Sequence, residues 1–342
     1  MNRTSILYPL ILVVALAAPI FIEEWSLTQL AQYMIYGIFA MGLAFLWGQS
    51  GLMCFGHALF FGLGAYMMAL SSKGMLPGLP ASQALGFLLA MVVPALWAFV
   101  FGMALFKGKA LTGAYFGIVT LATAIIAERI ATNWDYIGGF NGILDLPPLT
   151  LNFGSFTYEV WEPLPSYYTS LSFALAVFLL LFWLNRSTFG SLLRGVRDNE
   201  MRLSFMGYDV PLIKTMAFCL AGALAGLSGA LFVTQFYFVS PALVGFSLST
   251  EVLIWVALGG KEVLLAAFLG AVSVKYMESF LSDRLGQYWL LVLGLLFIIS
   301  VIALPRGLLG GLLKPELPRR FSLRAKEQPP GQSPASEPVT EQ

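Results

Sequence analysis

Hydrophobic residues along the chain gather into long runs that glycine, proline and charged residues separate. A transmembrane helix needs about 20 apolar residues to cross a hydrocarbon core of about 30 Å. The runs that approach this length lie at residues 8–22, 27–47, 51–72, 84–106, 113–132, 169–185, 213–235, 244–259, 262–282 and 287–304. The pattern predicts an all-α fold, a polytopic membrane helix bundle with about ten transmembrane helices inside a domain of residues 1–314.

The first run resembles a secretory leader, since Arg3 precedes it and small residues lie around Ala15 to Ala18. We interpret it as the first span, because another long apolar run follows at once. With Arg3 inside, alternate threading puts residues 133–168 outside and gathers most basic residues near span ends on the inner face, as the positive-inside rule requires. This threading counts 244–259 as a full span, and a re-entrant segment there would move the C-terminal tail to the other side.

Charged residues cluster between the sixth and seventh of these runs. They are Arg186, Arg194, Arg197, Asp198, Glu200, Arg202, Asp209 and Lys214. Asn199, Gly207 and Pro211 interrupt a basic amphipathic stretch, which predicts one or two short helices under the membrane, presented to a soluble partner. We assign residues 186–212 to this intracellular loop. A loop whose arginines only fix the topology explains the same residues equally well.

Composition agrees with an integral membrane protein and narrows its functions. Hydrophobic residues make up 58% and charged residues 11% of the chain, whereas soluble domains carry about 25% charged residues. A net charge of +1 offers no footprint for nucleic acid. We interpret Cys54 and Cys219 as small hydrophobes, and a single histidine makes a histidine-based metal site improbable. No cofactor is expected.

Two segments lie outside the predicted spans. Residues 133–168 combine glycine and proline with aromatic residues that can be buried, which predicts an ordered external cap. Residues 315–342 are rich in Pro, Ser, Gln and Glu and almost lack aromatic residues, so a disordered tail is expected there.

Glycines are dense in the third and seventh runs, at Gly56, Gly62, Gly64, Gly222, Gly226 and Gly229. Small residues let helix backbones approach closely in a membrane, and they also permit a buried helix to break where it lines a substrate path. We favour close helix packing. One such helix in each half also hints at two related halves.

Few residues are candidates for chemistry. Ser50 and His57 are spaced about two helical turns apart on one segment, so an intramembrane serine protease pair is disfavoured, and we interpret His57 as a hydrogen-bonded packing residue. Glu251 follows Ser249 and Thr250, and it belongs either to a pathway or gate or to the N-terminal cap of a helix.

Other polar residues in or between the runs complete the set of candidates. Asn141 in the external segment is a further pathway or gating candidate. Lys275 and Glu278 are spaced to neutralise each other on a helix. No ladder of acidic residues crosses the predicted spans, which weakens a proton-coupled transporter.

Several segments together resemble one family, the inner-membrane permease subunits of ATP-binding-cassette (ABC) importers for branched-chain amino acids. The matching segments recur in the family's order. They are SGLMCFGHALFFGLGAY (50–66), TGAYFGIVTLATAIIAE (112–128), IGGFNGI (137–143), FGSLLRGVRDNEMRLSFMGYDVPLIKTMAF (189–218), AGALAGLSGAL (221–231) and LPRGLLG (304–310). Of these, the segment with RDNE, residues 197–200, is the most specific.

The resemblance implies partners and a role. Such permeases pair with a sister permease in the bacterial inner membrane, receive substrate from a periplasmic binding protein and rest on two cytoplasmic ATPases. It implies that the ATPase-coupling residues are Arg194, Arg197, Asp198, Asn199, Glu200 and Gly207. The chain holds no GxxxxGK[ST] loop, so we expect a transport subunit and not an enzyme.

The sequence leaves alternatives for the transported substrate and for the class of protein. Urea and short-chain amide importers have similar permeases, and residues 249–260 resemble their version at least as well, while Lys261 and Glu262 depart from both groups. We expect branched-chain amino acids. An ATP-independent secondary transporter and an intramembrane serine protease are the alternatives of other classes.

Overall fold

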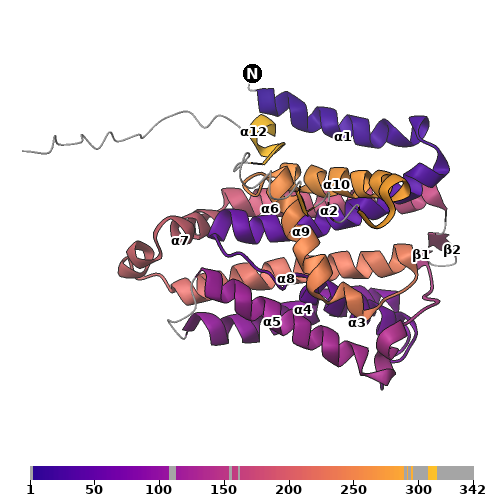
Figure 1. Cartoon of the computed structure of the whole chain (residues 1–342), viewed down its shortest axis with the longest axis horizontal. Coiled ribbons are helices and arrows are strands. Elements are labelled where there is room, and N and C mark those ends of the chain that lie inside the picture. The colour runs from indigo at the N-terminus through magenta and orange to yellow at the C-terminus, as the bar shows by residue number, and fades with distance from the viewer. Residues whose placement is uncertain are drawn as a thin grey trace, which may run out of the picture.

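Most helices of the computed structural model run side by side along one direction (Figure 1). The structure describes residues 3–107, 113–153, 156–160, 162–288, 291, 294–295 and 307–313. The α-helices are α1 (Arg3–Phe21), α2 (Glu24–Ser50), α3 (Ala58–Ser72), α4 (Gln83–Lys107), α5 (Ala114–Thr132), α6 (Pro163–Arg186), α7 (Thr188–Phe205), α8 (Val210–Phe236), α9 (Phe246–Gly259), α10 (Leu264–Leu285) and α12 (Gly310–Leu313). Short 3-10 helices are η1 (Asp135–Ile137), η2 (Gly139–Asn141), η3 (Pro241–Leu243) and η4 (Gly286–Tyr288).

The count of about ten spans is not confirmed. In the described part of the chain, 7 helical segments are long and apolar enough to cross a membrane. They are Glu24–Ser50, Gln83–Lys107, Tyr115–Thr132, Pro163–Arg186, Val210–Phe236, Pro241–Gly259 and Leu264–Ser282. Tyr8–Phe21 and Ala58–Ser72 are apolar but shorter, and most of the predicted run 287–304 lies outside the described residues.

The all-α bundle is confirmed, with one small β-hairpin added at an end of it. A hairpin of β1 (Leu149–Phe153) and β2 (Phe156–Val160) pairs antiparallel, with Leu149 opposite Val160. It lies in the segment predicted to cap the outer mouth, together with η1 and η2. Figure 1 shows this hairpin at one end of the long helices and α7 at the opposite end. The predicted tail, residues 315–342, lies outside the described residues.

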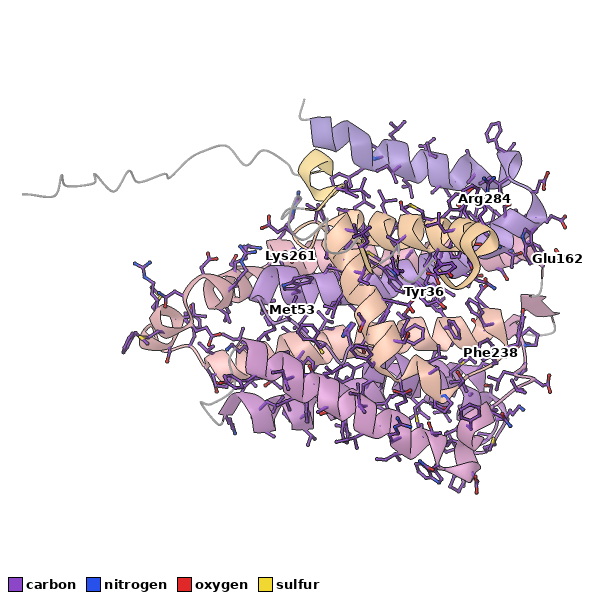
Figure 2. The ribbon with its side chains drawn as sticks, in the orientation of Figure 1. Tyr36, Met53, Glu162, Phe238, Lys261 and Arg284 are labelled. Carbon is purple, nitrogen blue, oxygen red and sulfur yellow. The ribbon has the colours of Figure 1, made fainter. Side chains whose placement is uncertain are left out.

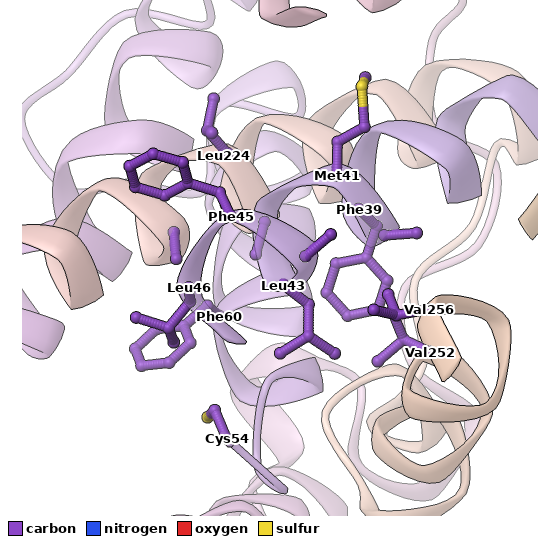
Figure 3. Packing of buried hydrophobic residues seen from close by; sticks show 14 of the residues in the cluster. Phe39, Met41, Leu43, Phe45, Leu46, Cys54, Phe60, Leu224, Val252 and Val256 are labelled. Carbon is purple, nitrogen blue, oxygen red and sulfur yellow. The ribbon is translucent and has the colours of Figure 1, made fainter. Parts of the chain in front are cut away.

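The core is centred on α2 and α8. In each of these helices 78% of the most apolar stretch is buried, compared with 22–28% in α4, α5 and α6. Figure 3 shows Phe39 and Leu43 of α2 packing among Phe60 of α3 and Val252 of α9. A helix that exposes most of its apolar surface is expected to face lipid, so α4, α5 and α6 form the outer wall of the bundle.

Glycines let α3, α4 and α8 approach until their backbones touch. A Cβ added at Gly64 would collide with the backbone of Gly226, and one at Gly229 with the carbonyl of Phe61. A Cβ at Gly226 would in turn meet the carbonyl of Ala90 on α4. Close backbone packing is the main attraction between helices in lipid, where no hydrophobic driving force draws them together.

The remaining glycines of the predicted set behave alike. Gly56 lies against the carbonyl of Thr120, Gly62 against Val244, and Gly222 against the α4 backbone at Pro94. All of these contacts join segments that are far apart in the sequence. The glycine pattern therefore serves tertiary contacts and not only local backbone freedom.

The chain is not helical between α2 and α3. Gly51 ends α2 in the left-handed conformation at φ 75°, and α3 begins only at Ala58. Side chains pair the freed backbone groups: Phe55 N donates to Thr120 Oγ1 at 3.2 Å, and Ala58 N donates to Ser249 Oγ at 3.1 Å. Irregular backbone at membrane depth needs such partners, because lipid offers none. Both a break and close glycine packing thus occur in this segment.

We predict that Gly229→Ala destabilises the bundle, because the new methyl group overlaps the backbone of α3. Overpacking of this kind costs about 1–3 kcal/mol. The measurement is the thermal midpoint of the detergent-purified chain. Gly311→Ala is the matched control, since a Cβ there meets nothing within 4 Å, and an equal fall in both variants would contradict the prediction.

Candidate functional site

The charged segment forms a kinked helix at one end of the bundle, which is α7 in Figure 1. Ser187 caps its start by accepting a hydrogen bond from Gly190 N at 3.5 Å. Asn199 breaks it with φ −163° and ψ 97°, and its Oδ1 accepts from Arg202 N at 2.9 Å, which caps the second half. Gly207, at φ +88°, ends the segment. Of the one or two short helices predicted from the breakers, the structure forms two, joined at the kink.

The two arginines of the first half turn inward, toward the end of α2. Arg197 Nη1 donates to Gly48 O at 2.6 Å. Arg194 Nη1 donates to Asn185 O at 3.0 Å and to Gln49 Oε1 at 3.4 Å. The last carbonyls of a helix lack partners in the helix and carry its negative dipole end, so they attract cations. These arginines therefore fix α7 to the ends of α2 and α6, while the side chain of Arg197 remains 36% exposed.

The second half of α7 is fixed to α8 by an ion pair. Lys214 Nζ contacts Glu200 Oε1, and the side chain of Lys214 is 4% exposed against 41% for Glu200. The ammonium also lies 5.6 Å from the centroid of the Phe106 ring. Asp198, by contrast, points outward with its side chain 72% exposed and lies 3.5 Å from Arg197. Lys214 belonged to the charged cluster but carried no predicted role, and its position in the second turn of an apolar helix was the only signal for one.

Exposed apolar side chains lie at the C-terminal end of α7. Phe205 is 85% exposed, Met201 69% and Met206 64%. With two polar neighbours they line a shallow groove of about 380 Å³, whose residues are Asn199, Met201, Arg202, Phe205 and Met206. Exposed apolar side chains rimmed by polar ones mark sites of protein contact.

A second group of charges lies between α2, α9 and α10, beside Tyr36 in Figure 2. Lys275 Nζ lies 3.0 Å from Glu251 Oε2 and 2.9 Å from Glu278 Oε2, the second contact lacking hydrogen-bond geometry. The ammonium also lies 4.8 Å from the ring centroid of Tyr36 and 5.1 Å from that of Trp255. We call these five residues the ion cluster. Its two carboxylates face one ammonium, which leaves an excess of negative charge when all three are ionised.

Ser249, Thr250 and Glu251 make different contacts in the structure. Helix α9 begins at Phe246, so Glu251 stands in its second turn and the capping interpretation was wrong. Ser249 is fully buried and accepts the hydrogen bond of Ala58 N at the start of α3. Thr250 Oγ1 donates to Phe246 O at 2.9 Å within the helix. Of the three predicted residues Ser249, Thr250 and Glu251, only Glu251 therefore belongs to the ion cluster.

The other sequence-predicted candidates lie apart from both groups. Asn141 is exposed in η2, on the hairpin side of the bundle. Ser50 Oγ donates to Leu46 O at 2.6 Å and not to the histidine. His57 is fully buried and stacks on Phe39 at 5.0 Å between ring centroids, and neither ring nitrogen has a hydrogen-bond partner among the described residues. The prediction of a hydrogen-bonded His57 was wrong.

The described part of the chain contains no cluster of residues that could hold a metal ion. No group of three His, Cys, Asp or Glu side chains is suitably placed there. Cys54 and Cys219 are both free. The geometry therefore offers two polar sites, the kinked helix α7 and the ion cluster.

These features define a class: a multi-pass helical membrane protein with a charged, kinked helix at one end that exposes apolar side chains. Comparison with known proteins gives the family. Residues 26–301 match the family described as "Branched-chain amino acid transport system / permease component", and the chain belongs to this family of ABC importer permeases.

The relatives share most of the chain. The high-affinity branched-chain amino acid transport system permease protein LivM of Salmonella typhimurium is 32% identical over 93% of this chain and 77% of its own length. LivM of Escherichia coli is 32% identical over the same shares of the two chains, 93% and 77%. The permease LivH of Salmonella typhimurium is 22% identical over 80% of this chain and 91% of its own. No solved structure matches the chain.

We predict that Glu200→Gln destabilises the chain more than Lys214→Met. The first change leaves a buried ammonium without its anion, which costs about 1–3 kcal/mol or more, whereas the second leaves a carboxylate that is 41% exposed and can hydrate. Thermal midpoints in detergent measure both, with Asp198→Asn, 72% exposed, as the control. The opposite ranking would show that the pair does not anchor α7.

Proposed function

We propose that this permease carries branched-chain amino acids across the bacterial inner membrane as one subunit of an ATP-driven importer. In this scheme it pairs with a sister permease, receives substrate from a periplasmic binding protein and rests on two cytoplasmic ATPases. The names of the LivM and LivH relatives support the substrate and, because two different permeases occur in one organism, the pairing. ATP hydrolysis is assigned to the partner subunits, and the permease itself is not an enzyme.

The observation that carries the proposal is the exposed apolar end of α7 on a braced helix. Its first half is bonded to the end of α2 through Arg197, and its second half is paired with α8 through Glu200. These two helices are the most buried of the long spans. A push on Phe205 and its neighbours would therefore reach the centre of the bundle through two anchors, with the kink at Asn199 as the hinge between them. Asp198 and Gly207 remain proposed members of this coupling segment.

The pathway is proposed to pass the ion cluster. Ionisable residues inside a membrane are costly and therefore usually functional. A free amino acid carries an ammonium and a carboxylate, and Glu251 and Lys275 offer the complementary charges. We place Glu251 at a gate, with Ser249 and Thr250 on the same helix and Asn141 toward the outer end.

The decisive experiment is uptake of radiolabelled leucine by proteoliposomes that hold the permease with its partners. We expect uptake to need ATP and to stop when the catalytic glutamate of the ATPase is replaced by glutamine. Excess isoleucine should compete, and excess urea or acetamide should not. Uptake that persists with the inactive ATPase would replace the importer by a secondary transporter, and competition by urea or acetamide would change the substrate.

We predict that Phe205→Ser lowers substrate-stimulated ATP hydrolysis by about tenfold, because a contact residue at the centre of a protein interface contributes about 1–2 kcal/mol or more. Folding should be unchanged, since this side chain is 85% exposed. Phe140→Ser is the matched control, since Phe140 is 82% exposed in η2 on the hairpin side. Normal stimulation in the Phe205 variant would remove α7 from the ATPase contact.

A further inference from the structure

An apolar groove separates α1 from the rest of the bundle. It encloses about 250 Å³ and is lined by α1, α2, α6 and α10, including Tyr8, Leu12, Met41, Leu175, Phe178 and Phe268. The Tyr8 hydroxyl is the one polar side-chain group among its lining residues. Leu179, on its edge, is 54% exposed, so the groove opens to the surroundings of the bundle.

The groove has a closed end and a charged end. Near the hairpin side, Tyr167 Oη donates to Ala15 O at 2.6 Å and ties α1 to α6. Toward the opposite end of α6, a row of neighbouring aromatic rings continues from the groove. Tyr8 lies 6.0 Å from Phe178, and Phe178 lies 5.9 Å from Phe182, between ring centroids.

The row of aromatic rings ends at the positively charged side chain of Arg186. The guanidinium of Arg186 lies over the Phe182 ring at 4.1 Å from its centroid. Arg186 is exposed, and no acidic side chain in the described part of the chain forms an ion pair with it. From Phe178 to Arg186 the helix rises about 12 Å. An apolar slot thus leads to an unneutralised cation at the end of a membrane helix.

We propose that this groove binds one anionic phospholipid, with an acyl chain between α1 and α6 and the phosphate at Arg186. The apolar lining matches a hydrocarbon chain, and basic pockets between transmembrane helices on the cytoplasmic side bind anionic head groups. Close packing argues in the same direction, because an empty slot of this size forfeits the dispersion contacts of its walls. The lipid would fill the space that holds α1 away from α6 and α10.

Native mass spectrometry of the detergent-purified full chain tests this, with dioleoyl phosphatidylglycerol and dioleoyl phosphatidylcholine offered in equal amounts. We expect the wild type to retain phosphatidylglycerol about fivefold better, since one basic residue near an anionic lipid contributes about 1 kcal/mol. Arg186→Gln should abolish this preference. Lys107→Gln, which removes an exposed basic residue at the end of α4, should keep it.

Filling the slot tests the acyl chain separately. Leu175→Trp from α6 and Leu12→Trp from α1 should each lower retention of both lipids, and either variant suffices if the other fails to fold. Inorganic phosphate alone should not displace the lipid, because the chain and not the phosphate supplies most of the contact. Equal retention of both lipids by the wild type, or unchanged retention in the filled variants, would overturn the proposal. So would an oxidant-induced disulfide between Leu179→Cys and a cysteine introduced on the sister permease in the assembled importer, since a protein would then occupy the groove.

Discussion

The pairing of backbone groups inside a membrane is the constraint on which the rest of this structure depends. Lipid offers neither hydrogen bonds nor a hydrophobic force between helices, so α3, α4 and α8 meet through glycines whose backbones touch. The same constraint governs the break before α3. There, Thr120 and Ser249, on two other helices, supply the oxygen atoms that the backbone amides of Phe55 and Ala58 need. The break therefore joins α3 to α5 and α9 and is part of the tertiary structure.

The packed centre gives the charged helix α7 its two fixed points. The carbonyl of Gly48 at the end of α2 binds Arg197, and Lys214 in the second turn of α8 binds Glu200. Because each anchor lies at the end of a buried helix, the exposed tip of α7 is mechanically connected to the core. Two of its arginines, Arg194 and Arg197, are bonded within the permease, while the exposed tip of α7 carries the apolar side chains of Met201, Phe205 and Met206.

Charged groups inside the bundle likewise need favourable contacts within the protein. Lys275 lies between two carboxylates and two aromatic rings, so an ammonium at membrane depth keeps favourable contacts on several sides. His57 is the contrast, since it is buried on Phe39 with both nitrogens lacking a partner among the described residues. Buried polar groups without partners are rare, and this one lies where the chain re-enters a helix.

The sequence by itself determined the class of protein, the close-packing glycines and the kinked charged helix, because run length, glycine density and breaker residues are local signals. It also identified Lys275 and Glu278 as a pair, since three residues on one helix set their distance. Only the tertiary structure decided the inward turn of Arg197, the partner of Lys214, the third member Glu251 of the ion cluster, the number of full-length helices and the groove beside α1. Those features join residues that are distant in the chain, such as Gly48 and Arg197, 149 positions apart, and hydrophobic periodicity carries no information on which distant segments meet.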